Sequence, residues 1–401
     1  MISIEFDDFY GGIILFVPEI KIIIMRIGIL TLPPHANYGG ILQAYAMQTV
    51  LERMGHNVVV FNNPIKKQVL PFPMSLFHYI VRFIKKYIFR KPNIYVFTEL
   101  KRYKYQKANT LYTNAFVNNH LHNIFIDSLV DIKNEYDAII VGSDQVWRKI
   151  YFNMSWETNK TDDAYLAFTN DWNIKRIAYA ASFGVDYLEL DDTEILNCKD
   201  AIQKFKAVSV REKTGVDICK KHFNVDATWV ADPTLLLDVS DYLALAKDSN
   251  FLFTGKYILK YALDESEEIY GLAHKLEEQK GFPMKELKTH EKDSLSEISN
   301  CTRRPVEEWL YAFAHADYIL TDSFHGTVFS ILFHKQFTVI ANKERGITRF
   351  TSLLSMFGLE NRLIYSPNEY KQLPDIDYDE VDIRLEQRRS ESLDFLSKAL
   401  N

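Results

Sequence analysis

Short apolar runs alternate along most of the chain with longer amphipathic segments. The short runs, bounded by Gly, Pro, Asn or Asp, are typical of buried parallel strands, and the longer segments have helical spacing. The predicted strands lie at 26–32, 58–61, 138–141, 175–180, 207–210 and 228–231, and then at 257–261, 317–320 and 337–340. This alternation predicts an α/β protein built on doubly wound, Rossmann-like parallel sheets.

The length of the chain, 401 residues, exceeds one comfortable hydrophobic core, so two domains are expected. We place the first domain at residues 25–240 and the second at 250–375. The hinge is expected between Leu237 and Phe251. A long charged helix at 378–401 is predicted to pack back on the first domain.

Residues 1–24 are apolar in patches, but charged side chains interrupt them and no cleavage site follows. Met25 begins a regular strand, so we expect Met25 to be the natural start and 1–24 to be an N-terminal extension. No apolar run reaches the ~18 residues of a membrane-spanning helix. Three cysteines at wide spacings form neither a disulfide framework nor a zinc pattern, which favours a reducing cytoplasm.

Composition and charge exclude some classes of function. The net charge of −6 argues against a protein that binds nucleic acid through bulk electrostatics. No cluster of His, Asp and Glu has the spacing of metal ligands, so no metal is expected.

One segment, residues 71–107, departs from the acidic average. It interleaves aromatic and aliphatic residues with nine Lys or Arg, and Glu99 is its one acidic residue. Helices of this composition can rest on an anionic membrane surface. The alternative is a helical excursion packed on the sheet with a solvated basic face.

The loop after the strand at 317–320 carries the strongest candidate for chemistry. Asp322, Ser323, His325 and Gly326 follow this strand, and Thr327 begins the predicted helix 327–334. Ligands bind at the carboxyl edge of open α/β sheets, and a helix amino terminus offers N–H groups to an anion. An imidazole there can transfer a proton near neutral pH, although it could instead merely cap the helix.

Other strand ends carry polar groups suited to an anion and a sugar. Asn37, Gly39 and Gly40 offer backbone N–H groups before a helix, although a structural turn would use the same residues. Arg211 directly follows a strand, and its guanidinium suits a carboxylate or phosphate unless it is paired with Glu212. Further candidates are Asp144, Gln145 and Trp147 after another strand, Lys343 and Arg345 at the edge that carries His325, and Tyr38. Trp147 could stack on a sugar ring or belong to the core.

Six motifs in order resemble the polysaccharide pyruvyl transferase family. They are Asn37-Tyr-Gly-Gly-Ile-Leu-Gln43, Gly142-Ser-Asp-Gln-Val-Trp147, Tyr179-Ala-Ala-Ser-Phe-Gly184, Val208-Ser-Val-Arg-Glu212, Ala231-Asp-Pro-Thr-Leu-Leu236 and Asp322-Ser-Phe-His-Gly326. The resemblance implies two Rossmann-like domains facing a cleft, similar to the GT-B glycosyltransferases. It also implies phosphoenolpyruvate as co-substrate and a sugar of a surface or capsular polysaccharide precursor as acceptor, with a pyruvate ketal as product.

The resemblance also implies roles for individual residues. His325 and Arg211 would hold or protonate the donor, and Lys343 aligns approximately with a further basic residue of the family. Many members have an arginine where this chain has Ser323, so Lys343, Arg345 or Arg349 would have to supply that charge.

The complete set of predicted site residues has three parts. The catalytic residues are His325 as acid, with Asp144 and Asp322 as candidate bases; the donor-binding residues are Arg211, Lys343, Arg345, Ser323, Gly326, Thr327, Asn37, Gly39 and Gly40; the acceptor-binding residues are Trp147, Gln145 and Tyr38. No cofactor besides the co-substrate phosphoenolpyruvate is expected.

Two rival functions stay open from the sequence. The first is a glycosyltransferase that uses a nucleotide sugar on the same architecture, and the second is a non-catalytic glycan-binding member. For the enzyme we expect a lipid-linked oligosaccharide as acceptor and a cytoplasmic location. Segment 71–107 would then provide peripheral contact with the inner face of the membrane, and no nucleic acid partner is expected.

Overall fold

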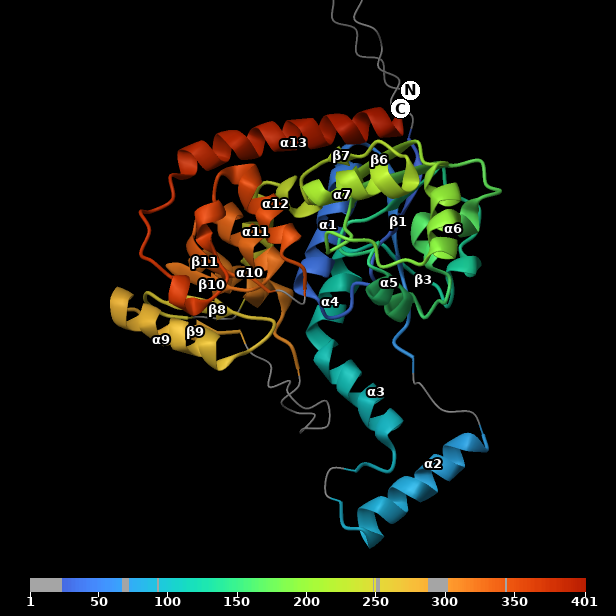
Figure 1. Cartoon of the computed structure of the whole chain (residues 1–401), viewed down its shortest axis with the longest axis horizontal. Coiled ribbons are helices and arrows are strands. Elements are labelled where there is room, and N and C mark those ends of the chain that lie inside the picture. The colour runs from blue at the N-terminus through green and yellow to red at the C-terminus, as the bar shows by residue number, and fades with distance from the viewer. Residues whose placement is uncertain are drawn as a thin grey trace, which may run out of the picture.

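The computed structural model describes residues 24–66, 72–91, 94–247, 249, 253–287, 302–342 and 345–401. Two parallel sheets with their covering helices form two adjoining α/β units (Figure 1). The predicted α/β class with two doubly wound sheets is therefore confirmed.

The first sheet has seven strands in the order β3-β2-β1-β4-β5-β6-β7. All of its neighbouring strands pair in parallel. The strands are β1 (Arg26–Leu30), β2 (Asn57–Asn62), β3 (Asn123–Phe125), β4 (Ala138–Val141), β5 (Lys175–Ala181), β6 (Ala207–Val210) and β7 (Thr228–Trp229). The order reverses between β1 and β4, which is the point where doubly wound sheets bind ligands.

The second sheet has five parallel strands in the order β12-β11-β10-β8-β9. They are β8 (Ile258–Tyr261), β9 (Met284–Glu286), β10 (Tyr318–Thr321), β11 (Gln336–Ile340) and β12 (Leu363–Ile364). Here the order reverses between β8 and β10, and His325 follows β10.

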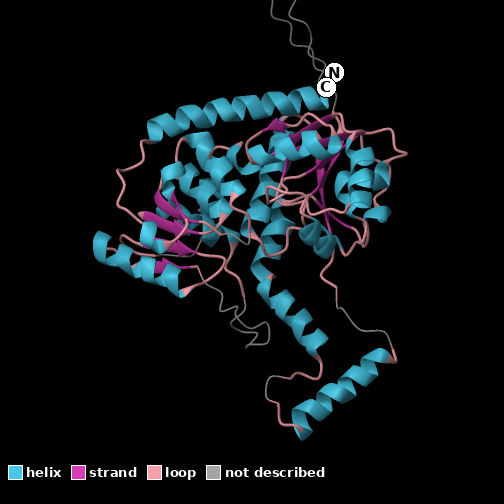
Figure 2. Ribbon diagram, viewed as in Figure 1, coloured by secondary structure: helices cyan, strands magenta, loops and turns pink. Residues whose placement is uncertain are grey.

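Helices cover the sheets and make the connections between strands (Figure 2). They are α1 (Tyr38–Arg53), α2 (Met74–Phe83), α3 (Thr98–Asn109), α4 (Leu111–His120), α5 (Lys149–Trp156), α6 (Asp192–Ile202), α7 (Lys213–Ile218), α8 (Val239–Ala246), α9 (Glu267–Lys280), α10 (Val306–His315), α11 (Phe324–Leu332), α12 (Thr348–Phe357) and α13 (Tyr378–Leu400). A π-helical turn at Ile84–Ile88 continues α2.

One apolar core runs through both units. It joins Ile27 and Ile41 of the first unit to Leu259, Phe313 and Val328 of the second, all of them inaccessible to solvent. Burial of apolar side chains on both sides of this junction stabilises the relative placement of the two sheets.

Some predicted elements differ from the observed ones. The short strands β3, β9 and β12 were not predicted, since two or three residues carry no recognisable pattern. Helix α8 occupies most of the predicted hinge. Helix α11 begins at Phe324 rather than at Thr327, because the Ser323 side chain caps it by accepting the Gly326 N–H.

Helix α13 crosses both units (Figure 1). On the first unit, Arg389 donates hydrogen bonds to the carbonyls of Leu235 and Leu237, and the Ser392 hydroxyl accepts the Ala231 N–H. On the second unit, Asp382 pairs with His334 at 2.9 Å. The C-terminal helix therefore ties the two sheets together.

The described part of segment 71–107 does not pack on the sheet. Helix α2 and the outer part of α3 project away from both sheets (Figures 1 and 2). The sequence-based alternative of an excursion packed on the sheet is therefore wrong for the described part of this segment. No helix among the described residues combines the length and apolarity needed to cross a membrane.

Candidate active site

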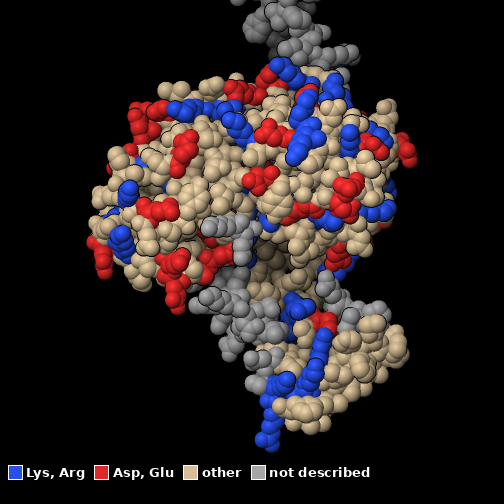
Figure 3. Space-filling view, in the orientation of Figure 1, with Lys and Arg blue, Asp and Glu red and all other residues tan. Residues whose placement is uncertain are grey.

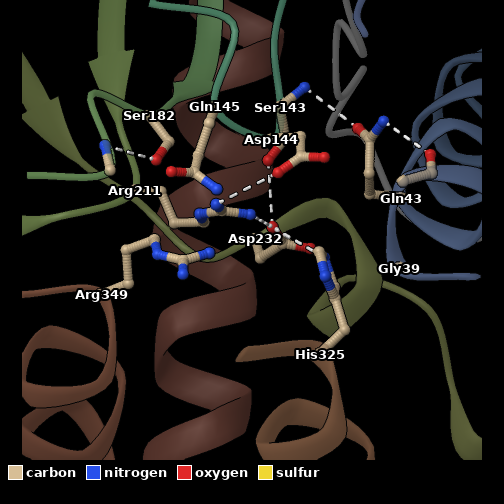
Figure 4. A network of polar contacts seen from close by, with 12 residues as sticks. Gly39, Gln43, Ser143, Asp144, Gln145, Ser182, Arg211, Asp232, His325 and Arg349 are labelled. Carbon is tan, nitrogen blue, oxygen red and sulfur yellow. Dashed lines mark hydrogen bonds and ion pairs between the residues drawn. The ribbon is translucent and has the colours of Figure 1, made fainter. Parts of the chain in front are cut away.

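A cluster of buried polar side chains lies where the two units meet (Figure 4). Arg211 directly follows β6, and Asp232 follows β7. His325 comes from the other unit, in the first turn of α11. Because the carboxyl ends of parallel strands share one edge, residues distant in sequence are brought together there.

Asp232 is the centre of this cluster. Its Oδ2 accepts hydrogen bonds from Arg211 Nη1 at 2.7 Å and from Ser143 Oγ at 3.0 Å. His325 Nε2 lies 3.8 Å from the same oxygen, a charge contact too long for a hydrogen bond. One carboxylate thus joins the imidazole and the guanidinium that the sequence predicted to converge.

The charges in the cluster perturb one another strongly. Burial alone would raise the pKa of the Asp232 carboxyl, but His325, Arg211 and Thr234 outweigh it and hold that pKa well below its ordinary value. Burial would likewise lower the pKa of Arg211, yet the carboxylates of Asp232, Glu212 and Asp144 raise it. Both groups are therefore charged at neutral pH.

Glu212 forms a second acidic contact with Arg211. Its Oε1 lies 3.5 Å from Arg211 Nε and accepts a hydrogen bond from the Ser182 hydroxyl. Burial raises the pKa of Glu212, although Arg211 and Ser182 oppose the shift. The structure therefore contains the Arg211–Glu212 pair, which the sequence had left as an alternative, and this pair is part of the cluster around Asp232.

Arg349, from the first turn of α12, provides a second guanidinium (Figure 4). Its guanidinium carbon lies 5.8 Å from the centre of the Phe324 ring, on which Arg211 stacks at 4.2 Å. Burial and the neighbouring Arg211 lower the pKa of Arg349 to about 10. It is still a cation at neutral pH, and its Nε has no hydrogen-bond partner.

Four buried polar atoms in this cluster have no hydrogen-bond partner. They are Arg211 Nη2, Glu212 Oε2, His325 Nε2 and Arg349 Nε. Each such atom costs about 1–3 kcal/mol when it is left unsatisfied. Three of the four can donate to an anion, so together they suggest a ligand with several acceptor oxygens.

The first unit approaches the imidazole very closely. A Cβ placed on Gly39 would lie 2.0 Å from His325 Nδ1, so only glycine allows this approach. Asp144 lies at the next strand end, with its Oδ1 3.7 Å from Arg211 Nη2 and a left-handed backbone (φ 52°) that aspartate tolerates better than most residues. The Gln43 side chain holds the adjoining loop by accepting the Ser143 N–H.

The three predicted acceptor residues are engaged in packing. Trp147 is buried, stacks on Tyr165 at 5.0 Å and donates its indole N–H to Ala164. Tyr38 stacks on Trp309 across the junction of the units. Gln145 is buried, and its Oε1 accepts a hydrogen bond from Arg148. Tyr165 covers the Trp147 ring and Trp309 covers the Tyr38 ring, so the packing favours the core alternative for Trp147, and acceptor binding by these residues stays a prediction.

Several predicted donor residues serve the local backbone. Asn37 caps α1 by accepting the Gly39 N–H, and Ser323 caps α11. The Gly326 N–H is therefore occupied, and the Thr327 N–H and hydroxyl both bond to the Ser323 carbonyl. Gly40 lies beside the cluster, since a Cβ placed on it would be 3.5 Å from Asp144 Oδ2.

Two further predicted residues, Asp322 and Arg345, are engaged outside the cluster. The Asp322 carboxylate accepts the N–H groups of Leu263 and Asp264, so it anchors that loop, and burial raises its pKa. Arg345 forms a partly exposed two-point pair with Asp264. Lys343 lies outside the described residues. Of the two described cations weighed as a replacement for the arginine absent at Ser323, Arg349 reaches the cluster and Arg345 does not.

Sequence reasoning did not assign Asp232, Glu212 or Ser143 to the site. The signal for Asp232 was present, since Asp232-Pro-Thr follows a strand end like the other candidate loops. Among the described residues, no group of His, Cys, Asp and Glu could hold a metal ion.

The sequence profile described as polysaccharide pyruvyl transferase matches residues 37–344. The chain therefore belongs to the polysaccharide pyruvyl transferase family, as its motifs predicted. The match includes His325, Arg211, Asp232 and Asp144, and Arg349 lies just beyond it. The chain is thus a member of a transferase family that acts on polysaccharides.

No curated protein matches the sequence. Similar solved structures include the UDP-GlcNAc 2-epimerases of Methanocaldococcus jannaschii (12% identity, TM-score 0.46, 90% of this chain and 92% of that one) and Neisseria meningitidis (10%, 0.45, 93% and 93%). An α-glucosyltransferase in complex with UDP and DNA is also similar (8%, 0.42, 94% and 95%). At these scores the likeness carries no conclusion about ligand or activity.

Proposed function

We propose that this protein transfers the enolpyruvyl group of phosphoenolpyruvate to a sugar of a surface polysaccharide precursor and closes it to a pyruvate ketal. The observation that carries the proposal is the cluster of unpartnered donors on His325, Arg211 and Arg349. Phosphoenolpyruvate carries a phosphate and a carboxylate, so it can satisfy donors on both guanidinium groups at once.

The acidic side chains of the cluster have to be offset when this donor binds. Asp144, Glu212 and Asp232 face Arg211 and Arg349, and the two arginines alone do not balance the three acids. The imidazolium form of His325 is the form that can donate a proton. Glu212, whose pKa is already raised by burial, can take up a proton when the anionic donor binds.

In the proposed reaction, His325 acts as general acid on the methylene carbon of phosphoenolpyruvate. The new C–H bond forms a methyl group and makes the central carbon electrophilic. One sugar hydroxyl adds to that carbon and loses its proton, and phosphate departs with the electron pair of its C–O bond. A second hydroxyl of the same sugar closes the ring and loses the second proton.

Asp144 is the proposed base for the attacking hydroxyl, because it borders the cluster. One released proton restores the His325 imidazolium, and the other leaves with phosphate. Arg211 and Arg349 stabilise the departing phosphate, an electrostatic task that strengthens where water is excluded. His325 and Arg211 are only 6% and 3% exposed, so the surrounding loops have to part for the donor and then close over it.

The acceptor is proposed to be a polyprenyl-linked sugar, and the reaction is proposed to take place in the cytoplasm. The free cysteines Cys198 and Cys219 are both buried, which suits a reducing compartment.

The test is to incubate the purified protein with phosphoenolpyruvate and a panel of polyprenyl-linked sugars, and to follow phosphate release and the ketal methyl signal by NMR. His325→Ala should lower turnover at least ~100-fold while calorimetry shows nearly unchanged affinity for phosphoenolpyruvate. Full turnover in that variant would remove His325 from the chemistry. A protein that binds nucleotide sugars but not phosphoenolpyruvate would instead be a glycosyltransferase.

A further inference from the structure

The projecting segment presents a large apolar surface that nothing described in this chain covers. We call the described residues 72–91 and 94–109 the arm; they contain α2, the π-helical turn and α3. Exposed large apolar side chains follow one another along the arm at helical spacing. They are Phe72, Met74, Leu76, Phe77, Ile80, Phe83, Ile84, Tyr87, Ile88, Phe89, Phe97 and Leu100.

The exposure on the arm is a property of one face. Phe77, Ile80 and Ile88 are 66%, 50% and 67% exposed and stand three, eight and eleven residues apart, the spacing of one helix face. Isolated exposed apolar residues are ordinary on protein surfaces, but a continuous set of this size marks a surface that binds another apolar body.

The other face of α2 is already used to build the arm. Tyr79 packs on Phe97 with ring centres 5.1 Å apart, and Arg82 pairs with Glu99 at 2.7 Å. These contacts hold α2 against the segment that leads into α3. The apolar face therefore points outward from a folded hairpin.

Basic residues accompany this apolar surface (Figure 3). Residues 71–107 contain nine Lys or Arg in a chain whose net charge is −6. Glu99, their one acidic residue, is engaged by Arg82. Lys85, Arg90 and Lys91 are exposed at the far end of the hairpin.

The base of the arm leads to the candidate site. The arm leaves the first sheet after β2, at the same carboxyl edge that carries Gly39 and Asp144. Helix α4, which follows the arm, holds the loop before α1 through a hydrogen bond from Thr113 to the His35 carbonyl at 2.5 Å. A surface bound by the arm would therefore lie on the side of the sheet where the cluster lies.

We propose that the arm docks on an anionic lipid bilayer, with its apolar face in the interfacial region and its cations at the headgroups. An apolar face flanked by Lys and Arg matches both components of such a surface. A symmetric contact between two arms would bring the nine basic residues of each arm together, so charge disfavours a second copy as the occupant. The proposal concerns the arm alone and does not depend on the proposed reaction.

The experiment is co-sedimentation of the full chain with two kinds of vesicle, phosphatidylcholine alone and phosphatidylcholine with about one third phosphatidylglycerol. Binding is expected to the anionic vesicles, weakening as salt is raised, and not to the neutral ones. The triple variant Lys85→Gln, Arg90→Gln, Lys91→Gln should weaken binding roughly a hundredfold. Its matched control removes three exposed lysines elsewhere, Lys204→Gln, Lys206→Gln and Lys221→Gln, and should bind as the parent does.

A second pair of variants tests the apolar face. Phe77→Gln with Ile80→Gln should also weaken sedimentation with anionic vesicles, whereas Ile383→Gln, at a site 71% exposed on α13, should not. Circular dichroism and analytical ultracentrifugation of each variant check fold and oligomeric state. The proposal is overturned if the parent ignores anionic vesicles, if both arm variants bind like their controls, or if the arm variants change oligomeric state instead.

His325→Ala should bind vesicles like the parent, and the arm variants should keep phosphate release with a water-soluble acceptor analogue. Failure of docking and failure of the proposed reaction are thereby distinguished.

Discussion

Replacing Gly39 by alanine tests whether the close approach of the two units forms the working site. Gly39 is the second residue of α1 and lies against the His325 ring. An added Cβ would be 2.0 Å from Nδ1 and 2.3 Å from Cγ of that ring. Ordinary contacts begin near 3.4 Å, so the imidazole or the helix that carries it has to shift by at least about 1.4 Å.

The expected effects on stability and on catalysis differ. Alanine favours the helix over glycine by up to about 1 kcal/mol, and the forced shift costs about 1–3 kcal/mol. These terms oppose each other, so we expect the free energy of unfolding to fall by less than about 2 kcal/mol. A displacement of this size at a proton donor should lower turnover about 100-fold.

The matched control is Gly271→Ala in α9, where an added Cβ meets no atom within 4 Å. Both variants are compared by urea unfolding and by phosphate release from phosphoenolpyruvate. Gly271→Ala should be at least as stable as the parent and fully active. If Gly39→Ala also keeps full activity, the imidazole position seen here is not the one that reacts.

Two further substitutions probe the charges of the cluster. Arg349→Met should weaken phosphoenolpyruvate binding at least tenfold, as measured by calorimetry. The control Arg345→Met removes only a partly exposed pair with Asp264 and should leave the affinity unchanged. Equal losses of affinity in the two variants would contradict the assignment of Arg349. Asp232→Asn should lower the free energy of unfolding by about 3 kcal/mol at neutral pH, because Arg211 stays buried without its closest carboxylate. The folded state holds the Asp232 pKa below its ordinary value of about 4. The difference in the free energy of unfolding between the parent and Asp232→Asn is therefore fully present above that pH and shrinks as the pH falls further. A difference in urea stability that instead grew in acid would refute this pairing.

The sequence predicted the framework of the fold well, because the long central strands carry unambiguous apolar runs. Strands such as β4 and β6 were placed within the observed bounds. The short strands at the sheet edges had no such signal. The start of α11 was misplaced because a cap at Ser323 competes with the preference for a longer loop.

Part of the candidate site could be predicted from the sequence because of the topology of the sheets. Arg211 directly follows β6, and His325 lies in the first turn of the helix after β10, so each is placed at the carboxyl edge of its own sheet by topology. Arg349 could not be assigned in this way, because it follows a loop of several residues whose course sequence does not reveal. Two readings stayed open for Trp147, because its motif cannot tell a ring facing a ligand from a ring stacked on Tyr165.

The apolar core shared by the two sheets limits which substitutions this protein can accept. The distance between Asp232 and His325 depends on packing across the junction of the two units, where side chains such as Tyr38 and Trp309 stack with ring centres 5.6 Å apart. A core substitution that removes a methylene at this junction would alter the distance between Asp232 and His325 without touching either residue. Residues remote from the chemistry therefore help to set the distance between the reacting groups. Substitution at those positions is limited by its effect on the rate of the reaction as well as by its effect on stability.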